Sequence, residues 1–183
     1  MGNERLETTL RYYGISPWEI EVIYGYLVGR FTVRQEELEQ EALEPENEEF
    51  VSFLEMCIPL EFNDAFFQWF EYKRWEKIKA VFKEMKRRRG SKHALKIKVN
   101  FAGRTKIIFI IDTDERQWFN NAIEKMDFVL ELLPYHLNPE RLPPDTSEVI
   151  YRFHADTVRW RLHAAISAGV QYTFKGDSWK AVS

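Results

Sequence analysis

The chain has 183 residues, which is the size of one domain or of two small domains that share a core. Its composition is 45% hydrophobic, 30% charged and 15% aromatic, which excludes an intrinsically disordered protein. The longest apolar run, Ile107 to Ile111, is far shorter than the ~20 residues that cross a bilayer, so we expect no membrane partner. The start lacks an apolar signal segment, and the single cysteine, Cys57, excludes an internal disulfide and a four-thiolate zinc site. We therefore expect a cytoplasmic protein.

The net charge of −3 conceals three blocks of different sign. Residues 1–60 carry a net charge of −9, residues 61–111 a net charge of +9 and residues 112–183 a net charge of −3. Eight of the fourteen residues from Glu36 to Glu49 are glutamate, and Lys83 to Arg89 is a nearly unbroken basic run. Such blocks are typical of solvated helix faces, but they also fit a molecule that repels polyanions at one end and attracts them at the other.

The first 60 residues predict four short helices. Leu6, Leu10 and Tyr13 have helical spacing and predict the first helix, which Gly14 ends. The run Ser16–Glu19 has the pattern of a capping box and predicts a second helix that ends at Gly29.

Two further helices are expected before residue 60. A second capping box, Thr32–Gln35, predicts an acidic helix that extends to about Leu43. The fourth helix begins at Pro45, and Pro59 ends it.

The next segment predicts one long helix, from Asn63 or Asp64 to Gly90. Six of the ten residues from Phe66 to Trp75 are aromatic and cannot share one helix face, so its first half must be covered on more than one side.

After Gly90 the hydrophobic period changes from 3.6 to 2. The pattern predicts a hairpin of two strands, Leu95–Phe101 and Lys106–Asp112, followed by a helix over 114–133. A proline-containing loop over 134–147 is a candidate partner contact, and a strand over 148–153 follows it. Residues 156–169 fit a helix, which we favour, or a strand, and residues 170–182 fit a final hairpin with its turn at Gly176-Asp177.

We therefore predict an α+β protein. It has a helical N-terminal half, one long aromatic-rich linking helix, and then a small mixed sheet built from a β-hairpin, a helix, a strand, a helix and a β-hairpin. The expected units are an acidic helical subdomain over 1–60, the linking helix over 61–90 and an α+β subdomain over 91–183.

Two aspartates, Asp112 and Asp114, are the candidate catalytic residues. The run Ile110-Ile111-Asp112-Thr113-Asp114 resembles the first motif of haloacid-dehalogenase-type phosphatases, and also the aspartate pair of nucleotidyl-transfer palms. The resemblance implies Mg²⁺ held at a strand end for phosphoryl transfer. It covers only these residues, because Glu115-Arg116 replace the small residues that such phosphatases place next. The same acids are typical of a helix start, which we favour.

A basic face is the candidate nucleic-acid interface, because lysine and arginine side chains neutralise backbone phosphates. Its members lie at the end of the long helix and on or beside the exposed side of the hairpin. They are Lys86, Arg87, Arg88, Arg89, Lys92, Lys96, Lys98, Arg104 and Lys106.

The acidic segment is the candidate site for a basic protein partner, through Glu36, Glu37, Glu41 and Glu44. The helices around Gly29 have the proportions of a helix-turn-helix, but glutamates on the second one would repel phosphate, so we reject a DNA reader. The four histidines lack the spacing of a helical metal site, and we expect no metal and no cofactor.

The sequence favours a non-enzymatic macromolecular interaction protein with separated acidic and basic surfaces. We expect a protein partner or self-association into an oligomer, and nucleic-acid association is a special case of the same hypothesis. The alternative function is a Mg²⁺-dependent phosphoryl-transfer enzyme that uses Asp112 and Asp114.

Overall fold

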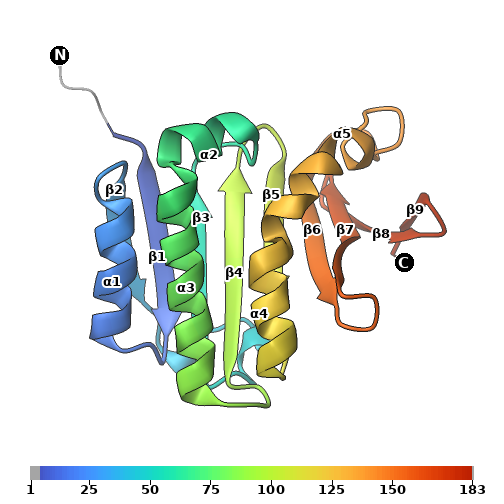
Figure 1. Ribbon diagram of the computed structural model, residues 1–183. Helices are drawn as coiled ribbons and strands as arrows, with labels where there is room; N and C mark the ends of the chain where they lie inside the picture. Colours follow the sequence, from blue (N-terminus) through green and yellow to red (C-terminus); the bar gives the residue numbers. More distant parts are fainter. Residues whose placement is uncertain (1–4, 183) are drawn as a thin grey trace.

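A single mixed sheet of nine strands carries helices on one of its faces in the computed structural model, which describes residues 5–182 (Figure 1). The elements of the first half are β1 (Glu7–Tyr13), α1 (Pro17–Leu27), β2 (Thr32–Glu37), η1 (Gln40–Ala42), η2 (Pro45–Asn47), β3 (Ser52–Ile58), α2 (Asp64–Phe70) and α3 (Tyr72–Arg89). The second half contains β4 (Leu95–Ala102), β5 (Lys106–Ile111), α4 (Arg116–Lys125), η3 (Met126–Glu131), α5 (Leu133–His136), β6 (Thr146–His154), β7 (Arg159–Ser167), β8 (Val170–Lys175) and β9 (Ser178–Ala181).

The strand order is β2-β1-β3-β4-β5-β6-β7-β8-β9, so the described residues leave β2 and β9 at the two edges. Three pairs, β1 with β2, β3 with β4 and β5 with β6, are parallel, and the other five are antiparallel. Each parallel pair is joined through helices, as a parallel connection requires. The fold therefore mixes helix and strand as predicted, but the sheet is much larger than the predicted one.

The prediction of a helical N-terminal half is wrong. Strands β1, β2 and β3 are present where three of the four helices were expected. Short 3-10 helices occupy part of the segment between β2 and β3. In β3 the apolar run is buried on both faces of the sheet, and such a run cannot be distinguished from a buried helix by its periodicity. In β2 a glutamate-rich sequence with low strand propensity is held in the sheet by pairing with β1.

The second predicted helix is confirmed as α1. Ser16 is its N-cap, and the Ser16 hydroxyl and the Glu19 carboxylate form the expected capping box. The long helix, by contrast, is divided into α2 and α3 at Glu71, whose φ of 78° ends one helix and begins the next.

The second half follows the predicted order with two corrections. The strands β4 and β5, the strand β6 and the hairpin β8–β9 are present as predicted. The helix predicted over 114–133 is α-helical only as α4, and η3 and α5 follow it into the predicted proline-containing loop. Residues 159–167 form β7 rather than the favoured helix, with Trp160 and Leu162 buried toward the helices and Arg159, Arg161 and His163 alternating with them. The strand alternative was therefore correct, because the period of 2 outweighed the helix propensity of the alanines.

The core lies between the sheet and its helices. Aromatic side chains of α2 and α3 pack on Phe101 of β4. Phe62, before α2, contacts both Phe101 and Phe109, with ring centroids at 4.9 and 5.0 Å. This core contains residues from all three predicted units, whose boundaries stay a prediction. No helix in residues 5–182 is long and apolar enough to cross a membrane.

Candidate functional site

The face of the sheet that carries no helix holds a row of charged side chains of alternating sign. Residues Glu36, Arg11, Glu55 and Lys98 are cross-strand neighbours on β2, β1, β3 and β4 in that order. Arg11 pairs with Glu36 at 3.4 Å and with Glu55 at 3.2 Å, and Glu55 also pairs with Lys98 at 3.5 Å. Burial raises the pKa of Glu55, but the positive charge of Lys98 and hydrogen bonds from Asn100 and Arg11 outweigh it, so the pKa lies below its usual value. We call this row the charge ladder; its opposite-charge pairs favour the observed register of the four strands.

The segment after β2 folds over one end of this ladder. Leu38 and Leu43 pack with Phe53 in a small apolar cluster, which anchors the segment on β3. Phe50 lies against the His93 ring at 5.2 Å, and the Lys96 ammonium lies over the Phe50 ring at 5.6 Å. The segment is therefore held to the sheet by its apolar residues.

The glutamates of the same segment point outward. All eight from Glu36 to Glu49 are exposed, and within the described part of the chain only Glu36 forms an ion pair, with Arg11. A hydrogen bond between the Glu44 and Glu46 carboxyl groups raises the pKa of Glu44 and lowers that of Glu46. We call these eight glutamates the acidic segment. The predicted partner-binding residues Glu36, Glu37, Glu41 and Glu44 all belong to this exposed set.

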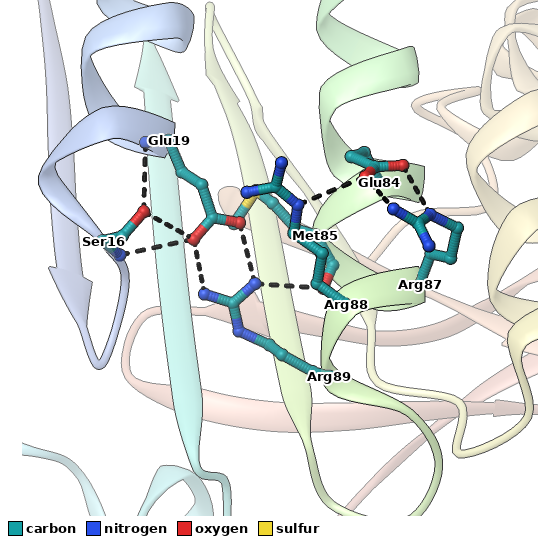
Figure 2. Close-up of polar contacts among 7 residues, drawn as sticks. All are labelled: Ser16, Glu19, Glu84, Met85, Arg87, Arg88 and Arg89. Atoms are coloured by element: carbon teal, nitrogen blue, oxygen red, sulfur yellow. Dashed lines mark hydrogen bonds and ion pairs between the residues drawn. The ribbon is translucent and has the colours of Figure 1, made fainter.

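The basic run at the end of α3 is arranged differently, as Figure 2 shows. The Arg89 guanidinium donates to both Glu19 carboxylate oxygens, at 2.7 and 2.8 Å, and also to the Ser52 hydroxyl at 2.8 Å. Only 5% of the Glu19 side chain and 15% of the Arg89 side chain are exposed. Burial raises the pKa of Glu19, but hydrogen bonds from Arg89 and its positive charge, together with Ser16, hold it below its usual value. Arg89 therefore ties α3 to α1 and is not available to a ligand.

The Glu84 carboxylate accepts hydrogen bonds from Arg87 and Arg88, which lie one turn further along α3 (Figure 2). Arg87 makes two hydrogen bonds to its carboxylate, at 2.5 and 2.8 Å, and Arg88 makes one at 3.2 Å. Hydrogen bonds from Arg87 are the main reason that the pKa of Glu84 falls to about 2. Both arginines are exposed, but a single carboxylate compensates part of their charge.

Two lysines of the predicted basic face lie inside the protein, which corrects the expectation that they are exposed. Lys86 is fully buried against α4, where its ammonium lies 5.4 Å from the Phe119 ring centroid and has no hydrogen-bond partner among the described residues. Lys96 is 2% exposed, and its ammonium lies over the Phe50 ring. Burial lowers the pKa of both ammonium groups.

The remaining predicted cations do not form one patch. Lys98 belongs to the charge ladder and is 18% exposed. Lys92 and Arg104 are exposed at opposite ends of β4, and Lys106 is half-buried at the start of β5. The proposed set of nine residues stays a prediction as a nucleic-acid site, but the fold does not gather it on one surface.

A different group of cations, which the sequence did not indicate, lies on β6 and β7. Arg152 and Arg161 are cross-strand neighbours on the helix-free face. His163 is the extra residue of a β-bulge, because Ile150 and Tyr151 pair with Ala164 and Leu162 and skip it. Burial lowers the pKa of His163, and the charges of Arg152 and His154 lower it further. The sequence feature that could have identified these residues is the alternation of Arg159, Arg161 and His163 with apolar residues.

The two candidate catalytic aspartates occupy unequal positions. The Asp112 carboxylate accepts from Arg152 at 3.2 Å, while Asp114 is exposed in the loop before α4. Neither caps the helix: its N-cap is Glu115, which makes no side-chain capping hydrogen bond. Within residues 5–182 no group of three or more His, Cys, Asp or Glu side chains is placed to hold a metal ion. The phosphoryl-transfer alternative stays a prediction.

A cavity of about 800 Å³ is lined in part by the predicted proline-containing loop. Leu142, Pro143 and Pro144 contribute to one wall, and Glu61 and Arg104 to another. The loop is fastened by hydrogen bonds from Thr146 to the Pro143 carbonyl at 2.6 Å and from Ser167 to the Pro144 carbonyl.

Comparison of the chain with protein families, with curated proteins and with solved structures found no match.

Proposed function

We propose that this protein is a non-enzymatic interaction protein that binds a basic protein partner through its acidic segment and the adjoining edge strand β2. The observation that carries the proposal is the exposure of eight glutamates of which, in residues 5–182, only Glu36 has an ion-pair partner. Like charges held this close repel one another, and a cationic partner would relieve that repulsion.

The open edge of β2 supplies a second reason. The Thr32 amide donates to the Leu6 carbonyl at 2.9 Å, and the Leu38 amide donates to the Tyr12 carbonyl at 2.7 Å. Because main-chain groups alternate in direction along a strand, those of Val33, Gln35 and Glu37 point away from the sheet. A strand of a partner can add to these groups, and the charges of Glu36 and Glu37 favour a basic one.

The arrangement of the cations argues for a protein partner over a nucleic acid. A polyanion that approaches the end of α3 meets arginines already paired with Glu19 and Glu84. The same polyanion is repelled at the acidic segment. Nucleic-acid binding is therefore the outcome that would count against the proposal.

The test uses a fluorescent ten-residue peptide of alternating lysine and valine, and its binding is followed by anisotropy. In one variant Glu37, Glu39, Glu41 and Glu48 are replaced by glutamine. In the control variant Glu21, Glu115, Glu131 and Glu140, which are exposed outside β2 and the acidic segment, are replaced instead. Both variants lose four negative charges, so the global charge effect is matched.

We expect the first variant to lose on the order of tenfold in affinity and the control to lose much less, because close charges dominate at a Debye length of about 8 Å. Equal losses in the two variants would show that only net charge matters and would overturn the proposal. The proposal would also fail if a single-stranded oligonucleotide bound more tightly than the peptide.

A further inference from the structure

Strands β7 and β8 separate partway along their length. They pair only where Ala164–Ser167 lie beside Val170–Thr173. Beyond that point Phe174 and Lys175 of β8 pair only with β9. The first part of β7, Arg159 to Leu162, therefore pairs with β6 on one side and with no described strand on the other. In Figure 1 the β8–β9 hairpin projects away from the sheet at the right.

The gap between the separated strands is a cleft of about 430 Å³, within the range of ligand-binding pockets. Residues 159–162 of β7 form one wall, and Phe174 and Asp177 of the hairpin belong to the opposite one. His136 also lines the cleft, and its Nδ1 lies 2.9 Å from the Tyr151 hydroxyl. The cleft thus exposes a length of unpaired strand edge, and its lining mixes apolar side chains with charged and polar ones.

The side chains of this open stretch divide by face. Trp160 and Leu162 face the helices, where the indole N–H of Trp160 donates to the Ala122 carbonyl at 2.9 Å. Arg161 lies on the helix-free face beside Arg152, and Arg159, two residues earlier, has the same orientation. His154, cross-strand from Arg159, and the bulged His163 add two further nitrogen bases to this face.

We infer that this open stretch of β7 binds an extended segment of another protein in which acidic and apolar residues alternate. Main-chain hydrogen bonds to an added strand provide affinity, as in other cases of strand addition. Directly opposed side chains of paired strands share a face, so acidic residues of the segment would lie beside Arg159 and Arg161. Its apolar residues would lie beside Trp160 and Leu162 and would contact Phe174.

This site is independent of the acidic segment and has the opposite sign. Six strand spacings of about 4.8 Å, or roughly 29 Å, separate β7 from β2 in the sheet. The charge separation predicted from the sequence, with the basic run of α3 as its basic side, stays a prediction, and Arg159 and Arg161 were not part of it.

The first test measures binding of a fluorescent eight-residue peptide of alternating glutamate and valine. Replacing Arg159 and Arg161 together by glutamate should weaken binding on the order of tenfold, because two favourable cross-strand pairs become repulsive. The control replaces Lys73 and Arg116, two exposed cations outside the cleft, by glutamate and should bind nearly as well as the parent. Thermal melts establish that both variants are folded.

The second test uses the unaltered protein and distinguishes strand addition from simple charge attraction. Two peptides carry N-methyl groups on alternate residues, in the two possible phases. If the peptide adds to β7, one phase removes the amides that donate to the sheet and abolishes binding, while the other phase binds.

Three results would overturn the inference. They are equal binding of the two methylated peptides, equal binding of the double variant and its control, and tighter binding of an oligonucleotide than of the glutamate–valine peptide.

Discussion

The acidic segment and the basic run of α3 are both dense blocks of one sign in the sequence, yet the fold treats them oppositely. The glutamates of the acidic segment remain exposed, and only Glu36 finds a partner within the part of the chain that the structure describes. The arginines of the basic run meet Glu84 on their own helix and Glu19 on α1, seventy residues away from Arg89. A block of like charge in the sequence therefore forms an exposed charged surface only where the fold places no opposite charge beside it.

The largest effect expected from this comparison concerns the buried member of the basic run. Replacing Arg89 by alanine leaves the Glu19 carboxylate buried without its partner, and removal of one partner of a buried pair costs about 3 kcal/mol of unfolding free energy. Chemical denaturation measures this loss. The matched variant Arg87→Ala, on the same helix but exposed, should leave the denaturation midpoint unchanged. Equal midpoints for the two variants would contradict the assigned difference between them.

The next effect has the opposite sign. Lys86 is a buried ammonium without a hydrogen-bond partner among residues 5–182, so Lys86→Met should stabilise the protein by about 1 kcal/mol at pH 7. Burial lowers the pKa of Lys86 in the folded state, so the cost of the buried charge decreases as the pH rises through that pKa toward the unfolded value. Thermal melts at pH 7 and pH 10 should therefore differ more in the parent than in the variant. A destabilised variant would show that the ammonium has an essential role.

Acid should destabilise the protein through the paired carboxylates. The pKa values of Glu19 and Glu55 lie below their usual value in the folded state. Their contribution is therefore complete above the unfolded pKa of about 4.3 and is lost as the pH falls through the folded values. Melting temperatures between pH 6 and pH 2 should fall more steeply for the parent than for the Glu19→Gln and Glu55→Gln double variant. Parallel curves would contradict the assigned pairs.

The smallest effect is expected in the acidic segment. Replacing Glu37, Glu39, Glu41 and Glu48 by glutamine should change the unfolding free energy by less than about 0.5 kcal/mol per residue, because these exposed side chains form no ion pair with residues 5–182. Because the substitutions remove repulsion between the glutamates, we expect a small increase in the unfolding free energy. A large loss of stability in denaturation would mean that the segment serves the fold and not a partner.

Local signals in the sequence predicted α1 and much of the second half of the fold. The capping box at Ser16, the alternation over residues 95–101 and the turn at Gly176-Asp177 each depend on neighbouring residues, and each predicted element is present. The strands β1, β2 and β3 depend instead on pairing between segments tens of residues apart. That pairing overrides the helical spacing of Leu6, Leu10 and Tyr13.

The candidate sites divide in the same way. The acidic segment was predictable because exposure of glutamate is its default. The pairing of Arg89 in the basic run was not predictable, because Glu19 is close to Arg89 only in the folded chain. The cations of β7 were missed when residues 156–169 were interpreted as a helix, in which Arg159, Arg161 and His163 do not share a face.

The most direct test of the central claim maps the contact of the lysine–valine peptide by amide hydrogen exchange. The account predicts slower exchange of the outward amides of Val33, Gln35 and Glu37 when the peptide is bound, with no change at residues 83–89. Protection at the end of α3, or protection spread evenly over the surface, would contradict it.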